Sequence, residues 1–273
     1  MNGIIPLATD EIHLWLAFYD EVAEDLHPVY RDILSAEERV QEPRFYFARD
    51  RRRYLVTRAL VRTVLSGYVS IPPADWNFSS NAYGRPEIAN AEGRAAGLSF
   101  NLSHTRSLIV LGVTRSRALG VDVENFRARE VSLDIAGRYF APAEVEELSV
   151  VPPHEQQYRF FEYWTFKESY IKARGMGLSL PLDKFSFHYP HDRGVAVTID
   201  PELADDAARW QFWQFRPLPE YLVAVCAERT GVRPPRLTVR RAIPMLSERT
   251  VSPILLRVTD AVSVGYEYSL QES

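Results

Sequence analysis

The chain has 273 residues, 46% of them apolar and 25% charged, so it can bury a sizeable core and its composition does not indicate disorder. The 32 Lys and Arg against 36 Asp and Glu give a net charge of −4, which excludes a chain that is strongly basic throughout, as many nucleic-acid-binding proteins are. The single cysteine, Cys226, excludes a disulfide framework and a cysteine-rich zinc site. No apolar run is long enough to span a bilayer, and the N-terminus lacks a signal-peptide pattern. We therefore predict a soluble, cytoplasmic protein.

The first half predicts a strand, a long helix and two further strands. Ile12, Leu14, Leu16 and Phe18 alternate with other residues, which is typical of a strand with one buried face. Ser35 followed by Glu38 predicts a capping box at the start of a short helix. The remaining elements are a helix over 51–65 and strands over 107–114 and 118–124, separated by a turn at 115–117.

The second half repeats this order. A helix is predicted over 157–173 with Gly175 as its C-cap, and 221–227 resembles the strand at 108–114. Two similar α+β halves are the economical interpretation, with residues 1–117 and 118–231 as the halves. Residues 232–273 form a C-terminal extension with paired prolines and clustered arginines, which we expect to pack on the core or to be partly mobile.

The sequence Gly-Val-Asp-Val-Glu at 120–124 contains the first informative pair of acidic residues. On a strand, Asp122 and Glu124 point to one face, while Val121 and Val123 point to the other. Two carboxylates on one surface suit Mg²⁺, which takes one or two carboxylates together with water and substrate phosphate. Taken alone, the pair is more typical of a half-solvated edge strand.

The helix at 157–173 contains the second cluster, Trp-Thr-Phe-Lys-Glu-Ser-Tyr-Ile-Lys at 164–172. Glu168 and Lys172 are four residues apart and share a helix face, where an exposed ion pair would contribute only about 0.3–0.5 kcal/mol. The helix is apolar on most sides, however, so we expect Lys167, Glu168 and Lys172 to meet a counter-charge or a ligand. Together the two clusters predict one site with carboxylates for a metal and ammonium groups for phosphate.

Weaker candidates lie in the first half. Ser103 and His104, in a polar turn at 101–105, can present a hydroxyl and an imidazole to phosphate oxygens, although a lone histidine in a turn is more often a surface residue. Arg53 and Arg85 are further candidate phosphate ligands.

The pair of motifs at 120–124 and 164–172 resembles the signatures G-[IV]-D-x-E and W-x-x-K-E-[AS]-x-x-K of the 4′-phosphopantetheinyl transferases. A looser similarity extends over about the first 230 residues and is closer to the two-half, surfactin-type branch than to the small trimeric branch. The resemblance implies a monomer with a pseudo-twofold α+β fold, in which each half packs a small antiparallel sheet on a long helix. Coenzyme A would bind in the cleft between the halves.

The resemblance also implies the reaction. Such an enzyme transfers the 4′-phosphopantetheine group of coenzyme A to a serine of an apo acyl, peptidyl or polyketide carrier protein. It requires Mg²⁺, with Mn²⁺ as a substitute, and releases adenosine 3′,5′-bisphosphate. Neither nucleic acid nor a membrane is expected as a partner.

Residue roles follow from the same resemblance. Asp122, Glu124 and Glu168 would bind the metal, and Glu168, Lys172 and His104 would be catalytic, with Glu168 as the base directly or through a metal-bound water. The family often has basic residues where this chain has Glu38 and Gln41, with Arg39 and Arg44 nearby. The expected phosphate contacts come from Arg53, Arg85, Ser103, His104, Lys167 and Lys172.

Two alternatives compete with this prediction. One is a Mg²⁺-dependent nucleotidyl or phosphoryl transferase that uses another nucleotide, against which the chain lacks a GxxxxGK[ST] or GxGxxG loop. The other is a coenzyme A-binding regulatory or assembly module without catalysis, against which the acidic and basic residues of both motifs are intact.

Overall fold

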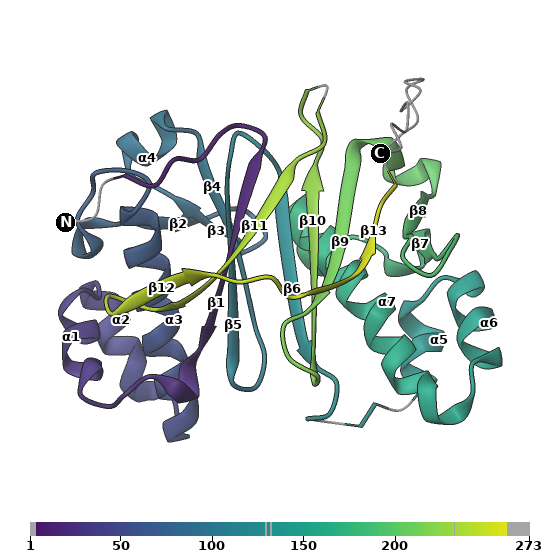
Figure 1. Cartoon of the computed structure of the whole chain (residues 1–273), viewed down its shortest axis with the longest axis horizontal. Helices are drawn as coiled ribbons and strands as arrows, with labels where there is room; N and C mark the ends of the chain where they lie inside the picture. The colour runs from purple at the N-terminus through teal and green to yellow at the C-terminus, as the bar shows by residue number, and fades with distance from the viewer. Residues whose placement is uncertain (1–3, 129, 132, 232, 261–273) are drawn as a thin grey trace, which may run out of the picture.

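A computed structural model describes residues 4–128, 130–131, 133–231 and 233–260. The fold is α+β, and its centre is formed by two sheets (Figure 1). One sheet has the strand order β12-β11-β1-β5-β4, and the other has the order β13-β9-β10-β6. All neighbouring strands are antiparallel except β1 and β11, which are parallel. The bounds are β1 Glu11–Phe18, β4 Leu98–His104, β5 Leu108–Arg115, β6 Leu119–Asn125, β9 Trp210–Arg216, β10 Tyr221–Glu228, β11 Arg236–Ile243, β12 Ser247–Thr250 and β13 Ile254–Val258.

Helices cover the outer faces of the sheets (Figure 1). Each half also has a two-stranded hairpin, formed by β2 with β3 and by β7 with β8. The hairpin bounds are β2 Phe78–Ser80, β3 Pro86–Ile88, β7 Phe185–His188 and β8 Ala196–Ile199. The α-helices are α1 Leu26–Asp32, α2 Ala36–Gln41, α3 Ala48–Ser66, α4 Ala91–Ala95, α5 Ala136–Tyr139, α6 Pro142–Val150 and α7 Pro153–Arg174. The 3₁₀ turns are Tyr19–Glu21, Glu42–Arg44, Pro73–Asp75, Leu133–Ile135, Gly177–Ser179, Leu182–Lys184, Pro201–Leu203 and Ala207–Arg209.

The expected internal repeat is present. In each half a first strand is followed by the long helix, a hairpin and two more strands, and the last strand lies between the other two. The first half uses β1, α3, β4 and β5 in this way, and the second uses β6, α7, β9 and β10. Local signals were also confirmed, because Ser35 and Glu38 form a capping box and Gly175 ends α7 with a positive φ of 67°.

The core has three layers, and this corrects the expectation for β1. Its residues Ile12, Leu14, Leu16 and Phe18 pack between the two sheets, as the alternation predicts. The other face is also buried, because Trp15 and Ala17 pack with α3. The alternating pattern predicted one buried face, but a strand that is covered on both faces has no solvent-exposed polar face. The pattern therefore underestimated the burial of β1. The third layer lies around α7, and Cys226 is fully buried there.

The C-terminal extension joins both sheets. Its strands β11 and β12 extend the first sheet beyond β1, and β13 extends the second sheet beyond β9. Arg257 on β13 forms an ion pair with Glu162 on α7, 3.2 Å from Nε to Oε1, and its guanidinium lies 3.7 Å from the centre of the Tyr189 ring. Residues 233–260 therefore pack on the core, while 232 and 261–273 lie outside the described residues. Across the described ranges, no helix has both the length and the apolar character required to cross a bilayer.

Candidate active site

The site begins with a close approach between β6 and α7. A Cβ atom placed on Gly120 would lie 1.9 Å from the carbonyl oxygen of Ser169 and 2.4 Å from the amide nitrogen of Ala173. Only glycine allows the strand and the helix to come this close. Since α7 presents Ser169 and Ala173 to the strand, its adjacent residues Glu168 and Lys172 are placed near Asp122, two residues along β6.

A buried hydrogen-bonded group lies at the centre of this contact. Oδ1 of Asp122 accepts hydrogen bonds from Nζ of Lys172 at 2.6 Å and from Oγ of Ser103 at 2.9 Å. Lys172 Nζ also donates to Ser103 Oγ at 3.0 Å. Ser103 belongs to β4 in the first half, whereas Asp122 and Lys172 belong to the second. One side chain from β4 and one from α7 therefore bind the same carboxylate oxygen of β6.

These side chains line a pocket of about 420 Å³ that both halves contribute to. The predicted residues Ser103, His104, Asp122, Glu124, Glu168 and Lys172 all line it. Leu102, Val123 and Trp164 complete the lining, and none of these three was among the predicted site residues. Trp164 stacks on Phe160 of the same helix with ring centres 5.9 Å apart. The structure thus brings residues from distant parts of the sequence into one cavity.

The surroundings of Glu168 in the pocket change the pKa of its carboxyl group. Burial raises its pKa first, and the nearby charge of Asp122 raises it further, while Lys172 acts in the opposite direction. A carboxylate with a raised pKa is a better proton acceptor than an ordinary surface glutamate. Glu168 is therefore a candidate general base that lines the pocket.

His104 lies at the end of β4 on the side of the pocket that the first half provides, so the prediction of a turn at 101–105 was wrong for residues 101–104, which belong to the strand. His104 is exposed as a whole, but partial burial of its ring lowers the pKa of the imidazole, and the charge of Arg53 on α3 lowers this pKa further. The imidazole is therefore mainly neutral at pH 7 and can donate one hydrogen bond to an anion. Arg53 itself pairs with Asp50, one turn earlier on α3, at 3.2 Å.

The similarity of the chain to known families includes every residue that lines this pocket. Residues 118–226 match the 4′-phosphopantetheinyl transferase superfamily, and residues 23–116 match the N-terminal part of 4′-phosphopantetheinyl transferases. The chain is 32% identical to HetI of Nostoc sp. over 84% of its own length and 93% of that protein. It is 34% identical to Sfp of Bacillus subtilis over 72% of its length and 84% of that protein, and both relatives are named 4′-phosphopantetheinyl transferases. The chain belongs to the 4′-phosphopantetheinyl transferase family. It is an enzyme of the Sfp-like branch.

Arg85 of this transferase lies beside the pocket, and its guanidinium is hydrogen-bonded to backbone carbonyl groups. Its guanidinium donates to the carbonyl oxygens of Lys172 at 3.0 Å and Leu119 at 3.2 Å, with a longer contact to Phe100 at 3.4 Å. These bonds connect β4, β6 and the last turn of α7. Arg85 also lines a second cavity of about 270 Å³, which shares Leu102, Glu168 and Lys172 with the first. The structure thus gives Arg85 a bracing role, at the wall of a cavity that adjoins the site.

Lys167 does not reach the pocket, contrary to the expectation from its motif. Its ammonium is fully buried on another side of α7, where it lies 2.7 Å from Oε2 of Glu144. It also donates to the carbonyl oxygens of Leu182 at 2.7 Å and Phe185 at 2.6 Å. Three acceptors satisfy the three donors of an ammonium group, so none remains for a phosphate. Lys167 is therefore a structural residue.

This difference between the two lysines predicts opposite results for matched variants. Lys167→Met leaves Glu144 buried without its cation, so we expect the free energy of unfolding in urea to fall by about 3–5 kcal/mol. Lys172→Met removes a partly exposed ammonium at the pocket, so we expect a smaller loss of stability but weaker coenzyme A binding. A Lys167→Met variant with normal stability and impaired coenzyme A binding would contradict the structural role.

Glu38, which stands where the family often has a basic residue, is also structural. Its carboxylate pairs with buried Arg62 at 2.8 Å and with Arg58 at 3.6 Å, in addition to its contact with Ser35. Arg62 in turn donates to the carbonyl oxygen of Trp76 at 2.9 Å. The acidic residue therefore holds α2 against α3 and does not face a ligand.

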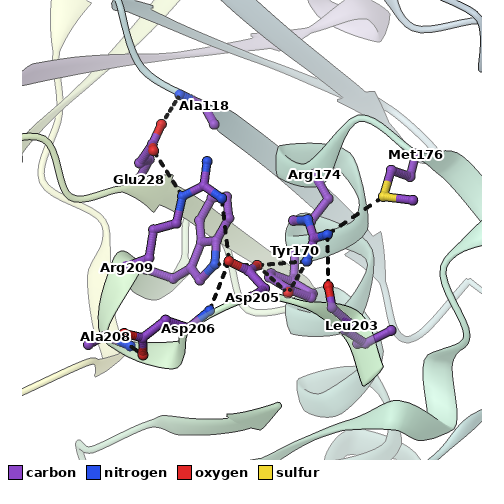
Figure 2. A network of polar contacts seen from close by, with 11 residues as sticks. Ala118, Tyr170, Arg174, Met176, Leu203, Asp205, Asp206, Ala208, Arg209 and Glu228 are labelled. Atoms are coloured by element: carbon purple, nitrogen blue, oxygen red, sulfur yellow. Dashed lines mark hydrogen bonds and ion pairs between the residues drawn. The ribbon is translucent and has the colours of Figure 1, made fainter. Parts of the chain in front are cut away.

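A network around Asp205 fixes the last turn of α7 and was not foreseen from the sequence. Oδ2 of Asp205 accepts hydrogen bonds from Tyr170 at 2.6 Å and Arg174 at 2.7 Å, the residues two before and two after Lys172 (Figure 2). Arg209 extends the network to Glu228, whose carboxylate accepts the amide hydrogen bond of Ala118 just before β6. Burial alone would raise the pKa of Asp205, but the hydrogen bonds and Arg174 together hold it below its usual value.

The pocket contains carboxylates, which are ligands of the kind that Mg²⁺ prefers. Oδ2 of Asp122 is buried and has no hydrogen-bond partner among the described residues, so a cation would satisfy it. Within the described ranges, no group of three or more Asp, Glu, His or Cys side chains is arranged to hold a metal ion. Mg²⁺ in phosphate-transfer sites commonly binds one or two carboxylates and completes its shell with water and substrate phosphate. Asp122, Glu124 and Glu168 line the pocket and supply carboxylates of this type, but in the described structure they are not gathered into a ligand set.

Proposed function

We propose that the pocket between the two halves binds the pyrophosphate of coenzyme A with Mg²⁺ and directs transfer of 4′-phosphopantetheine to a serine of a carrier protein. The observation that supports this best is the meeting of Asp122, Lys172 and Ser103 beside Glu168, in a cavity that both halves line. Negative charge accumulates on phosphate oxygens in phosphoryl-type transfer, so fixed positive groups and a positioned acceptor supply most of the catalysis.

Each residue has a defined task in this proposal. Lys172 holds a phosphate oxygen. Asp122, Glu124 and Glu168 would hold the metal, which would supply positive charge against the pyrophosphate. Glu168 accepts the proton of the carrier serine, directly or through an intervening water, as the serine oxygen bonds to the β-phosphorus. The bond from that phosphorus to the bridging oxygen breaks, and adenosine 3′,5′-bisphosphate leaves with the electron pair.

The two adjoining cavities suit an elongated ligand. They have volumes of about 420 and 270 Å³ and share Leu102, Glu168 and Lys172. A ligand with its pyrophosphate at the shared residues can extend from one cavity into the other. Coenzyme A has this form, with a central pyrophosphate between a nucleoside and a pantetheine arm.

The direct test is incubation with coenzyme A, Mg²⁺ and several apo carrier proteins, read by intact mass. We expect one carrier to gain the mass of one phosphopantetheine group, and the gain to disappear in excess chelator. Mn²⁺ should restore it. Binding of coenzyme A with no mass gain on any carrier would favour the non-catalytic module instead.

The same proposal includes a monomer in the cytoplasm that acts on acyl, peptidyl or polyketide carriers. Light scattering of the purified protein tests the monomer, since a dimer would double the expected mass of 31.3 kDa. Fractionation of cells that express the untagged chain tests the compartment.

Recognition of the 3′-phosphate is expected to come from Arg53 and His104. Arg53 lies close enough to lower the pKa of His104, so the two groups can act on one anion. We expect 3′-dephospho-coenzyme A to bind more weakly than coenzyme A by about tenfold, which corresponds to one charge-assisted hydrogen bond. Calorimetry with both ligands, repeated on Arg53→Ala, measures this. Equal affinities for the wild type would contradict it.

A further inference from the structure

A ladder of side-chain hydrogen bonds joins the two sheets along one edge of the site. On β4 and the turn after it, alternate side chains carry a polar oxygen that accepts a backbone N–H of β6. Asn101 Oδ1 accepts from Val121 at 2.8 Å, Ser103 Oγ from Val123 at 3.3 Å, and Thr105 Oγ1 from Asn125 at 3.2 Å. Ser99, two residues before Asn101, donates to the carbonyl oxygen of Arg117 at 3.0 Å.

The ladder connects an edge strand of one sheet to an edge strand of the other. β4 is the last strand of the first sheet and β6 is the last strand of the second, so each has one side without a strand partner. Unpaired backbone N–H groups must find another acceptor when they are buried. Here the acceptors are side chains of the other half. This arrangement connects the sheets without merging them into one.

The ladder fixes the peptides next to the acidic residues. The bonded amides of Val121 and Val123 lie on either side of Asp122, and those of Val123 and Asn125 lie on either side of Glu124. His104 is placed on the same short stretch of chain, between Ser103 and Thr105. The ladder therefore sets the position of His104 in the first half relative to Asp122 and Glu124 in the second.

We propose that Asn101 and Thr105 are positioning residues for transfer, which hold the two halves of the site in register through the backbone of β6. The proposal rests on the proposed function of the same pocket. Thr105 is the cleaner of the two for a test, because Asn101 lines the adjoining cavity whereas Thr105 lines neither of the two cavities at the site. Catalytic groups displaced by about 1 Å can cost up to about 10²-fold in rate.

The experiment compares Thr105→Val with Thr105→Ser. Valine keeps the shape but leaves the Asn125 amide without its acceptor, whereas serine keeps the hydroxyl. With Thr105→Val we expect kcat to fall by about tenfold to a hundredfold while KM for coenzyme A changes less than threefold. Thr105→Ser should restore kcat to within threefold of wild type. Should the valine variant not fold, Thr105→Ala takes its place with the same expected fall.

A control distinguishes positioning from general loss of stability. Thr114 on β5 is buried and donates to the carbonyl oxygen of Glu11 at 2.9 Å, entirely within the first half. Thr114→Val should lower the melting temperature but leave kcat within threefold of wild type. Thr105→Val with wild-type kcat, or with a fall in kcat no larger than that of Thr114→Val, would overturn the positioning role. If wild type itself modifies no carrier, the proposed function fails instead, so the two failures are separable.

Discussion

Asp122→Ala should lose transfer activity by at least about 10³-fold while the protein stays folded. Asp122 is the meeting point of Lys172 and Ser103, and its second oxygen is buried without a partner in the described structure. Removing the carboxylate therefore removes the proposed metal ligand and releases the ammonium that should hold a phosphate oxygen. The fold should survive because β6 keeps its backbone pairing with β10.

Circular dichroism and thermal melting establish that the variant is folded, and the carrier-protein mass shift measures transfer. Asp122→Asn is the matched variant, because it keeps the shape and the hydrogen bond to Ser103 but loses the negative charge. We expect Asp122→Asn to be nearly as inactive as Asp122→Ala. Full activity of either variant, or of the wild type in excess chelator, would contradict the metal assignment.

Glu168→Gln is expected to bind coenzyme A within a few-fold of wild type and yet to transfer about 10²–10⁴-fold more slowly. The amide keeps the shape and one ligand oxygen, but it cannot accept the serine proton. Burial and Asp122 raise the pKa of the glutamate, which favours this role. Calorimetry and carrier mass shift on one preparation separate binding from transfer.

Lys172→Ala provides the contrast on the same helix face. Since Lys172 should hold a phosphate oxygen before and during transfer, its loss should weaken coenzyme A binding and slow turnover together. If Glu168→Gln transfers at a rate near that of wild type, Glu168 is not the base. The neutral imidazole of His104 would then be the next group to test.

The acidic site could be predicted from the sequence because its information is local. Glycine followed by two carboxylates with a spacing of two places both on one strand face, and a spacing of four places Glu168 and Lys172 on one helix face. The α+β repeat could be predicted from the sequence for the same reason, because each helix and strand has its own periodicity. The contact of Asp122 with Ser103 depends on tertiary structure, and the family resemblance placed both residues at one site without predicting their hydrogen bond.

The role of Lys167 could not be taken from its motif, although its neighbours contained a signal. Tyr163 and Ile171 lie four residues before and after Lys167, and both are buried, so the lysine shares the core face of α7. Its partner Glu144 is on another helix, and no spacing rule connects the two. The sequence also contains a signal for the ladder, because small polar residues stand at every second position, at 99, 101, 103 and 105. The hydrogen bonds that they form depend on the segment 117–125 beside them, which only the fold brings there.

The extension that joins both sheets has a consequence for synthesis of the protein. β1 pairs in parallel with β11, so residues 11–16 meet partners at 236–241 that leave the ribosome more than 200 residues later. β13 completes the second sheet later still. Either sheet therefore lacks an outer strand until residues 236–258 have emerged from the ribosome, and each half should stay sensitive to protease until then. A chain that ends at 231 and the chain of 273 residues, each released from the ribosome, should differ sharply in that sensitivity, because a domain whose contacts are distant in sequence must wait for its last strand.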